Sequence, residues 1–262
     1  MVLVAHNQEA LTRACLESLR PTTVPFELCV VDNGSTDGTE AYFRTFPLPY
    51  PLRYTRNAAN VGLISALNQG ARLASGETLC FIHNDTEMRE PAWLERLEAA
   101  LGDGRRIGLA GLYGARRVRR GGRYVGRTIV HCLEGGPGMR APVVEVAAVD
   151  GVCLCLRRSL LDEIGGFDEG YGFFHGYDRD LSFAVRERGL ACAVVDASFV
   201  HRGGGTRTGE WAPVAAAEDL EQRRQAMARF ARKWRRRLPS DVRGLPERIW
   251  SYMGRRHESA EA

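Results

Sequence analysis

The sequence predicts an α/β fold, with a mostly parallel central sheet flanked by helices and a C-terminal helical extension. Strand-like and helical segments alternate four times within about the first ninety residues, which is the pattern of a doubly wound parallel sheet. The segment 79–83 is a continuous apolar run that ends at Asn84-Asp85, as expected for a strand buried on both faces. A hydrophobic content of 44% over 262 residues is enough to fill a sizeable core.

The first half of the chain supplies strands whose carboxyl ends are expected to hold a ligand. The predicted strands are 2–5, 26–31, 52–55, 79–83 and 107–112. The predicted helices are 11–19, one after the turn-rich loop 32–38, 63–74 and 93–101. Asn84 and Asp85 then lie at the end of a central strand, where they suit a hard divalent cation that carries phosphates. A plain polar turn is an equal alternative for these two residues.

The second half of the chain has shorter and less regular segments. The predicted elements are a hairpin at 118–125, a mobile loop at 135–138, strands at 143–149, 152–156 and 191–195, and helices at 159–164, 178–188 and 219–238. We divide the chain into a domain at 1–205 with halves 1–112 and 113–205, a basic helical extension at 206–250 and a disordered tail at 251–262.

Charge is unevenly distributed, although the net charge is only +4. Arginines gather at 116–127 and 223–237, and such clusters favour partners with phosphate, whether nucleic acid, anionic lipid or a phosphorylated substrate. The seven cysteines lack the C-x-x-C spacing of metal sites, which predicts reduced thiols in a cytoplasmic protein. We expect no signal peptide at the start of the chain, and no apolar run approaches the length of a membrane span.

Seven short motifs occur in order within the first 205 residues. They are Asn7 after the first strand, 30–38 (VVDNGSTDG), 56–62 (RNAANVG) with Asn68, 83–86 (HNDT), 165–169 (GGFDE), 177–180 (YDRD) heading a helix that ends near Gly189, and His201 before a glycine run. In this order they resemble the family 2 glycosyltransferases, a large inverting group with the Rossmann-like GT-A fold. The resemblance implies an enzyme that moves a sugar from a nucleotide-diphosphate donor to a hydroxyl group.

The resemblance implies a donor site in the first half of the chain. The nucleotide-sugar-binding residues would be Ala5, His6, Asn7, Asp32, Asn60, Gly62, Asn84, Asp85 and Gly151. Asp32 is similar in position to the family carboxylate that holds the base or ribose, and Asn60 and Gly62 open a helix whose N–H groups suit phosphate or sugar oxygens. From the sequence alone, Asp32 is equally suited to a turn and Asn60 to a helix cap.

The resemblance also implies a metal site. His83-Asn-Asp85 stands where the family carries its D-x-D signature, and the first carboxylate is replaced, so Asp85 would be the main protein ligand of Mn²⁺ or Mg²⁺. His201 would add a second ligand or contact the diphosphate, because imidazole suits Mn²⁺ better than Mg²⁺. A structural role is the alternative for a lone histidine near a strand end.

Asp178 is the predicted catalytic residue, because the motif 177–180 places it at the head of a helix after an aromatic loop. As general base it would take the proton of the acceptor hydroxyl during an inverting displacement. Asp178 and Asp180 are alternatively first-turn acids favoured by the helix dipole. Many family members have Glu-Asp where this chain has Tyr177-Asp178, so Tyr177 and His175 are assigned to acceptor binding, while Phe173 and Phe174 are equally suited to the core.

The sequence thus predicts a metal-dependent inverting transferase that uses UDP- or dTDP-sugar and a glycan, lipid-linked or small-molecule acceptor, as in polysaccharide biosynthesis. The alternatives are an inactive relative that only binds donor, a nucleotidyltransferase, and a module that binds nucleic acid or another polyanion through its arginines. In the last helix, Leu220, Met227, Phe230, Trp234 and Leu238 mark one face. That face either packs on the domain or rests on an anionic membrane as a peripheral contact at its inner side.

Overall fold

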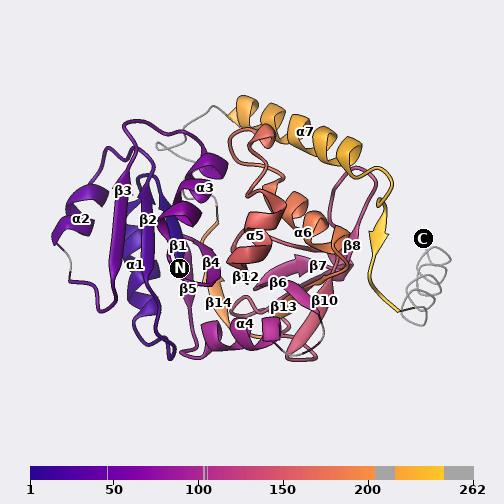
Figure 1. Cartoon of the computed structure of the whole chain (residues 1–262), viewed down its shortest axis with the longest axis horizontal. Coiled ribbons are helices and arrows are strands. Elements are labelled where there is room, and N and C mark those ends of the chain that lie inside the picture. The colour runs from indigo at the N-terminus through magenta and orange to yellow at the C-terminus, as the bar shows by residue number, and fades with distance from the viewer. Residues whose placement is uncertain (46, 103, 105, 204–215, 245–262) are drawn as a thin grey trace.

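An eight-stranded sheet runs through the molecule in the order β10-β13-β6-β12-β4-β1-β2-β3 (Figure 1). A computed structural model describes residues 1–45, 47–102, 104, 106–203 and 216–244. The strands are β1 Val2–Ala5, β2 Leu28–Asp32, β3 Leu52–Arg56, β4 Thr78–His83, β5 Thr86–Met88, β6 Ile107–Gly111, β7 Tyr113–Ala115, β8 Arg117–Val118, β9 Ile129–His131, β10 Val143–Val146, β11 Ala148–Val149, β12 Cys153–Arg157, β13 Ala191–Val195, β14 Phe199–His201 and β15 Ser240–Asp241. The helices are α1 Glu9–Leu19, α2 Thr39–Thr45, α3 Leu63–Leu73, α4 Trp93–Gly102, α5 Arg158–Ile164, α6 Tyr177–Glu187 and α7 Ala216–Lys233, with short 3₁₀ turns at Gly126–Thr128 and Glu169–Tyr171.

The sheet is parallel in its first half and mixed in its second. Strands β3, β2, β1 and β4 are parallel neighbours. Strand β12 runs antiparallel between β4 and β6, β13 is parallel to β6, and β10 closes the edge antiparallel to β13. The predicted mostly parallel sheet is confirmed, and its centre is β4, where Leu79, Cys80, Phe81 and Ile82 are all buried.

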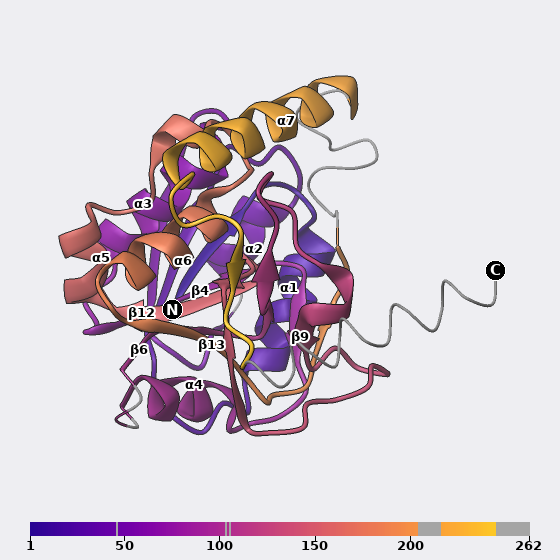
Figure 2. The ribbon, with the colours of Figure 1, turned by 90° about the vertical axis from the view of Figure 1, so that its right-hand side faces the viewer.

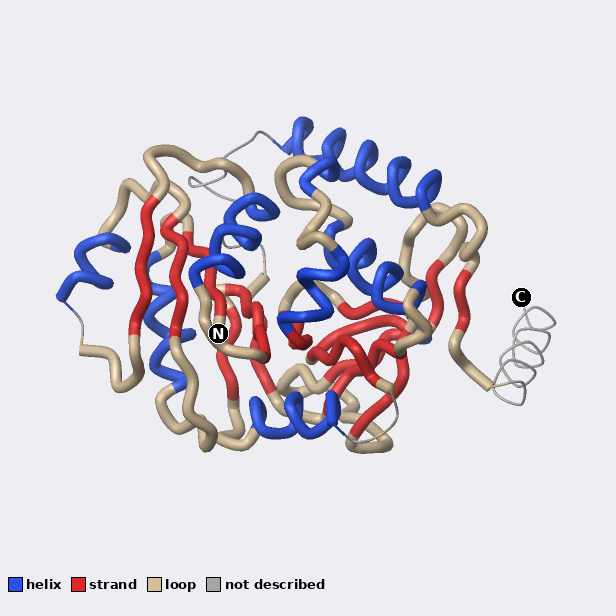
Figure 3. Tube along the Cα trace, in the orientation of Figure 1, coloured by secondary structure: helices blue, strands red, loops and turns tan. Residues whose placement is uncertain are grey.

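Helices cover both faces of the sheet, as the doubly wound pattern predicts (Figure 3). On one face, α1, α2 and α4 pack in one hydrophobic cluster with residues such as Leu3 and Ile82. On the other face, α3, α5, α6 and α7 pack in a second cluster with Val2 and Phe81. Successive side chains of β1 and β4 therefore pack in the hydrophobic clusters on opposite faces of the sheet, which explains why these strands are apolar throughout.

Several predicted boundaries differ from the observed ones. The predicted strand 143–149 is two strands in two sheets, because Ala147 turns the chain from β10 to β11. The predicted hairpin 118–125 is confirmed by an antiparallel bridge between Val118 and Tyr124 and by the Gly122 N–H, which donates to the Arg119 carbonyl at 2.9 Å; β8 also pairs with β15, which was not predicted. The predicted tail 251–262 and the start of the predicted extension at 206 lie outside the described residues, and the division of the chain into domains stays a prediction.

Helix α7 lies along the outer side of α6, as the two views at right angles show (Figures 1 and 2). Phe230 is fully buried, with its ring 4.9 Å from that of Phe183 on α6. Lys233 Nζ and Trp234 Nε1 bind the Asp180 carboxylate at 2.8 and 2.7 Å. The predicted apolar face therefore packs on the domain, except that Leu220, expected on that face, is 67% exposed. No helix among the described residues is long and apolar enough to cross a membrane.

Glu27, which precedes β2, fixes the connection between α3 and β4 and makes a pH-dependent contribution to stability. Its carboxylate accepts from the Ser75 hydroxyl at 2.8 Å, the Gly76 N–H at 3.0 Å and Arg53 Nε at 2.7 Å. Partial burial acts to raise its pKa, but the hydrogen bonds from Ser75, Arg53 and Gly76 outweigh it and lower the pKa of Glu27 to about 2. The folded pKa is therefore below the unfolded one, so this stabilisation is present above the unfolded pKa and lost as the pH falls toward 2.

We expect Glu27→Gln to lower the free energy of unfolding by about 2 kcal/mol at neutral pH, because hydrogen bonds to a charged acceptor are lost. The difference in unfolding free energy between wild type and variant should shrink as the pH falls below the pKa of Glu27 in the unfolded chain. Protonation of wild-type Glu27 then removes the stabilisation that depends on its charge. Urea denaturation across this pH range measures it, with the exposed Glu98→Gln as control. A difference that does not change with pH would contradict the assignment.

Candidate active site

A cavity of about 260 Å³ opens at the carboxyl ends of β1 and β4, where α/β sheets place their ligands. Most of the residues predicted for a site line it. They are His6, Asn60, Asn84, Asp85, Gly151, His175, Tyr177, Asp178 and His201. Phe174, which the sequence left between core and site, also lines the cavity and is only partly buried. The fold thus brings together residues that are up to about two hundred positions apart in the chain.

Ala5, Asn7, Asp32 and Gly62 do not line this cavity. The Asp32 carboxylate is fully buried and accepts from the Ser35 N–H and the Tyr54 hydroxyl, both at 2.8 Å. Behind the cavity wall, Asn7 Oδ1 accepts from the Thr36 N–H at 2.7 Å. The donor-binding roles given to these residues stay predictions, and the observed contacts of Asp32 and Asn7 are those of loop-holding side chains.

Asn33 lies in the loop 32–38 after β2, and its side chain lines the cavity. The sequence analysis did not predict it as a site residue. Its Nδ2 donates to Asn60 Oδ1 at 2.8 Å, and its Oδ1 accepts from Asn57 Nδ2 at 2.9 Å. Asn60 Oδ1 in turn accepts from the Gly62 N–H just before α3, at 3.0 Å. A network of side-chain amides therefore joins the end of β2 to the start of α3.

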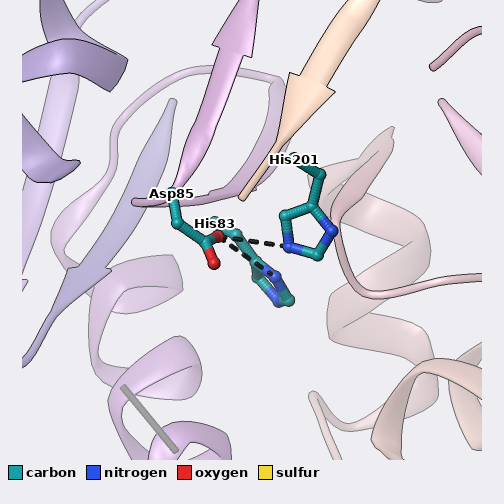
Figure 4. Close-up of side chains that lie close together, drawn as sticks. All are labelled: His83, Asp85 and His201. Atoms are coloured by element: carbon teal, nitrogen blue, oxygen red, sulfur yellow. Dashed lines mark ion pairs between the residues drawn. The ribbon is translucent and has the colours of Figure 1, made fainter. Parts of the chain in front are cut away.

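His83, Asp85 and His201 form a compact cluster on one wall of the cavity (Figure 4). Asp85 Oδ1 lies 3.2 Å from His201 Nε2 and 4.0 Å from His83 Nδ1. Strand β14 places His201 there by pairing antiparallel with β5, opposite Thr86. Burial alone would raise the pKa of Asp85, but the hydrogen bond from His201 and the charge of His83 outweigh it and keep that pKa below its usual range.

The histidine and carboxylate donors of this cluster fit a divalent transition metal. One ligand atom from each of the three residues lies within 4.8 Å of the others, and two imidazoles with one carboxylate suit Mn²⁺ better than Mg²⁺. Tyr177 Oη lies 3.2 Å from His83 Nε2, so the other ring nitrogen, Nδ1, faces Asp85. An outer hydrogen bond of this kind fixes the orientation of a metal-binding imidazole.

His83 was not predicted as a ligand, although a signal for it was present. It occupies the position of the carboxylate that the motif at 83–86 lacks, and it lies two residues before Asp85. Strand β4 ends at His83, and the tight turn at 84–85 that leads into β5 brings Asp85 back beside it.

Asp178 lies on the same cavity, with its side chain 7% exposed. Arg179 Nη1 lies 3.2 and 3.3 Å from its two oxygens, and the Arg179 guanidinium stacks 4.1 Å from the centre of the Tyr124 ring. Asp150 also lines the cavity, and burial together with the charge of Asp178 raises the pKa of Asp150. Asp150 was missed by the sequence analysis; its only signal was a carboxylate before a glycine between two strands.

The neighbour of Asp178 two residues along, Asp180, has a different role. It binds Tyr171, Lys233 and Trp234, so it anchors α7 besides being a first-turn acid. Helix α7 itself reaches the cavity with Arg223 and Met227, which the sequence did not predict.

Tyr177 packs so closely on Gly151 that the effect of Gly151→Ala can be predicted. A Cβ at Gly151 would clash with Tyr177 Oη, so the phenol would have to shift from the position in which it contacts His83 Nε2 at 3.2 Å. We expect a loss of about 1–3 kcal/mol in unfolding free energy, as for other overpacked sites, measured by chemical denaturation. At Gly126 a Cβ meets nothing within 4 Å, so Gly126→Ala is the control, and an equal effect of both changes would refute this reading of the contact.

Comparisons with known proteins agree with one another. The family described as "Glycosyl transferase family 2" matches residues 1–165. The "O-antigen biosynthesis protein RfbC" of Myxococcus xanthus is 28% identical over 225 residues, which cover 78% of this chain and 17% of that protein. The chain therefore spans less than a fifth of that relative.

Solved structures share the fold at low sequence identity. The structure of GalNAc-T7 with UDP, GalNAc and Mn²⁺ gives a TM-score of 0.62 at 18% identity, covering 76% of this chain and 42% of that one. The mannosyltransferase PcManGT of Pyrobaculum calidifontis with GDP-Man and Mn²⁺ gives 0.57 at 19% identity, covering 97% and 78%. Both likenesses establish the architecture of the chain, not its substrates.

Proposed function

Because the chain belongs to glycosyl transferase family 2, we propose that it transfers a sugar from a nucleotide-diphosphate donor to a hydroxyl acceptor with inversion at the anomeric carbon. One observation carries this proposal: the His83-Asp85-His201 cluster and the separate, buried carboxylate of Asp178 line the same cavity at the end of the sheet. An inverting transfer needs both, a centre of positive charge for the leaving diphosphate and a base for the acceptor.

His83, Asp85 and His201 would hold the divalent cation, for which we propose Mn²⁺ or Mg²⁺. When bound, the cation supplies positive charge that neutralises the donor diphosphate. Two solved GT-A structures of similar fold contain Mn²⁺, and the two imidazoles in this cluster favour the same ion.

Asp178 would act as the general base. Its carboxylate takes the proton of the acceptor hydroxyl while that oxygen forms the new bond to the anomeric carbon and the bond to the nucleoside diphosphate breaks. Arg179 Nη1 contacts both oxygens of the carboxylate from one side. Asn33, Asn60 and Asn84 would bind donor oxygens, and His175 with Tyr177 and Phe174 would form the acceptor side.

For the substrates we propose UDP- or dTDP-sugar as donor and a glycan, a lipid-linked molecule or a small natural product as acceptor. One of the two solved structures above contains UDP, which favours a uridine donor, while the other contains GDP-Man. We place the reaction in the cytoplasm, with a peripheral membrane contact through the basic C-terminal helix. We also assign it to polysaccharide biosynthesis, which the similarity to an O-antigen biosynthesis protein supports.

Thermal denaturation with UDP, dTDP, GDP and CDP, each with Mn²⁺, Mg²⁺ or a chelator, tests this function. At about a hundred times its dissociation constant a bound nucleotide adds roughly 2.7 kcal/mol of stability. We expect one diphosphate to stabilise the protein and the effect to disappear with chelator. Stabilisation without any turnover of the matching sugar donor would identify an inactive relative, and no stabilisation by any nucleotide would refute the proposal.

A further inference from the structure

The fold joins the two arginine-rich segments into one surface. Gly122, at the tip of the turn 119–123, packs on α7, since a Cβ there would lie 2.8 Å from Phe230 Cδ1. Beyond α7, strand β15 pairs with β8, with Ser240 opposite Val118. The arginines of 116–127 and those of 223–237 therefore lie side by side, although about a hundred residues separate them in sequence. We call the exposed arginines of these two segments the basic surface.

Most of the basic surface carries uncompensated positive charge. Its exposed arginines that form no ion pair with another described residue are Arg119, Arg120, Arg123, Arg223, Arg232, Arg235 and Arg236. Other basic residues nearby are neutralised, as Arg224 is by Glu221 and Arg237 by Glu187. The acidic residues Glu218, Asp219 and Glu221 lie in the first half of α7, so the uncompensated positive charge is concentrated at the end of the helix, just beyond it at Arg235 and Arg236, and on the turn 119–123.

The basic surface borders the cavity on the side of Asp178. Arg223 lines the cavity from α7. On the other segment, Tyr124 follows Arg123 and stacks on Arg179, which pairs with Asp178. An acceptor that reaches Asp178 from this side therefore passes along unpaired arginines.

Leu220 adds an apolar side chain to the same helix, between Asp219 and Glu221 and one turn before Arg223 and Arg224. At 67% exposure it is one of two large hydrophobic residues that stand out into solvent in the described part of the chain, the other being Val61. A cationic surface with an exposed leucine matches the interface of a bilayer, where headgroups pair with arginine and the leucine enters the acyl boundary. A soluble polyanion would match the charge but would leave Leu220 in water.

We propose that the basic surface docks on an anionic lipid bilayer and that the cavity takes its acceptor hydroxyl from a molecule anchored in that bilayer. The choice of acceptor rests on the proposed transferase function, whereas docking is a property of the surface itself. Each arginine near an anionic headgroup layer strengthens binding by about fivefold, so several unpaired arginines are enough for reversible attachment. The attachment weakens with salt, because the headgroup potential extends over only about a Debye length.

Vesicle sedimentation tests the docking. We expect the protein to bind vesicles of phosphatidylcholine with phosphatidylglycerol at low salt, and vesicles of phosphatidylcholine alone far more weakly. Combining Arg119→Gln, Arg120→Gln and Arg123→Gln should weaken binding by about a hundredfold if each loss counts about fivefold, as should Arg232→Gln, Arg235→Gln and Arg236→Gln together. The matched control removes the same charge at the opposite end of the sheet, with Arg13→Gln, Arg44→Gln and Arg53→Gln, and should change little.

Leu220→Ser separates lipid from other polyanions. We expect it to weaken vesicle binding severalfold and to leave binding to heparin or double-stranded DNA unchanged, because only the bilayer offers an apolar phase. Equal binding to neutral vesicles, an equal loss in the control variant, or release from vesicles by an equal charge concentration of heparin would overturn the proposal. The thermal shift with nucleotide should be the same in all these variants, so a failed transferase assignment and a failed docking surface give different results.

Discussion

Replacing Asp178 with asparagine is expected to lower kcat by about 10²–10⁴-fold, the usual contribution of a positioned general base. The change keeps the size of the side chain and removes its capacity to take a proton. It leaves the local helix intact, since the Ser182 hydroxyl donates to the backbone carbonyl of Asp178 and not to its carboxylate. The nucleotide-induced thermal shift should remain, because His83, Asp85 and His201 are unchanged and Asp178 is not a member of their cluster. Single-turnover release of nucleoside diphosphate with a matched acceptor measures the effect.

Asp180→Asn is the matched control for this experiment. It removes a buried carboxylate on the same first turn of α6, but one that binds Lys233 and Trp234 and does not line the cavity. We expect it to lower the melting temperature and to leave kcat per folded molecule nearly unchanged. If Asp180→Asn lowers kcat as strongly as Asp178→Asn does, the base assignment is wrong and the first turn of α6 is a structural support only.

Replacing Asp85 with asparagine is expected to abolish the metal-dependent stabilisation by nucleotide, roughly 2.7 kcal/mol at a hundred times the wild-type dissociation constant. Asp85 supplies the only carboxylate of the cluster, and an amide oxygen holds a divalent cation much more weakly than an ionised carboxylate. Even an outer-shell change typically costs 10–100-fold in metal affinity, so loss of the ligand itself should cost at least as much. Isothermal titration with Mn²⁺ and the cognate diphosphate measures both affinities.

Glu87→Gln provides the control for Asp85. Its carboxylate lies two residues further on, in β5, and binds Arg202 and Arg89 away from the cluster. We expect the control to bind Mn²⁺ as wild type does. Retention of chelator-sensitive nucleotide binding in Asp85→Asn would show that the cation, if any, is held elsewhere in the chain.

The sequence allowed the fold and the centre of the site to be predicted because both are encoded by local patterns. The apolar run of β4 and the polar pair after it are contiguous, so burial and ligand position follow from one stretch. The position of Asp178 follows in the same way from the start of α6. The role of Asp32 was harder to predict, because a short polar side chain in a turn gives the same sequence pattern whether it faces a ligand or holds the loop.

What the sequence left open depends on contacts between distant segments. His175 lines the cavity with its Nε2 2.9 Å from Asp219, and no local pattern links a residue of the aromatic loop to one on α7. Asp150 lies near Asp178 because the chain there leads into β12, which returns through the middle of the sheet. The exposure of Leu220 likewise follows from how α7 is rotated by Phe230 and Asp180, and helical periodicity alone could not set that angle.

Strand β12 has a consequence for how the molecule moves. It is hydrogen-bonded to β4 on one edge and to β6 on the other, so one continuous ladder runs beneath the donor and acceptor sides of the cavity. A hinge between the two sides would have to break the five residue pairs that join β12 to β4 or the two that join it to β6. We therefore expect the floor of the cavity to stay rigid through a catalytic cycle, with slow amide hydrogen exchange in β4 and β12 whether substrates are bound or not. We then expect substrates to enter and leave through movements of side chains at the rim of the cavity rather than through the opening and closing of two lobes.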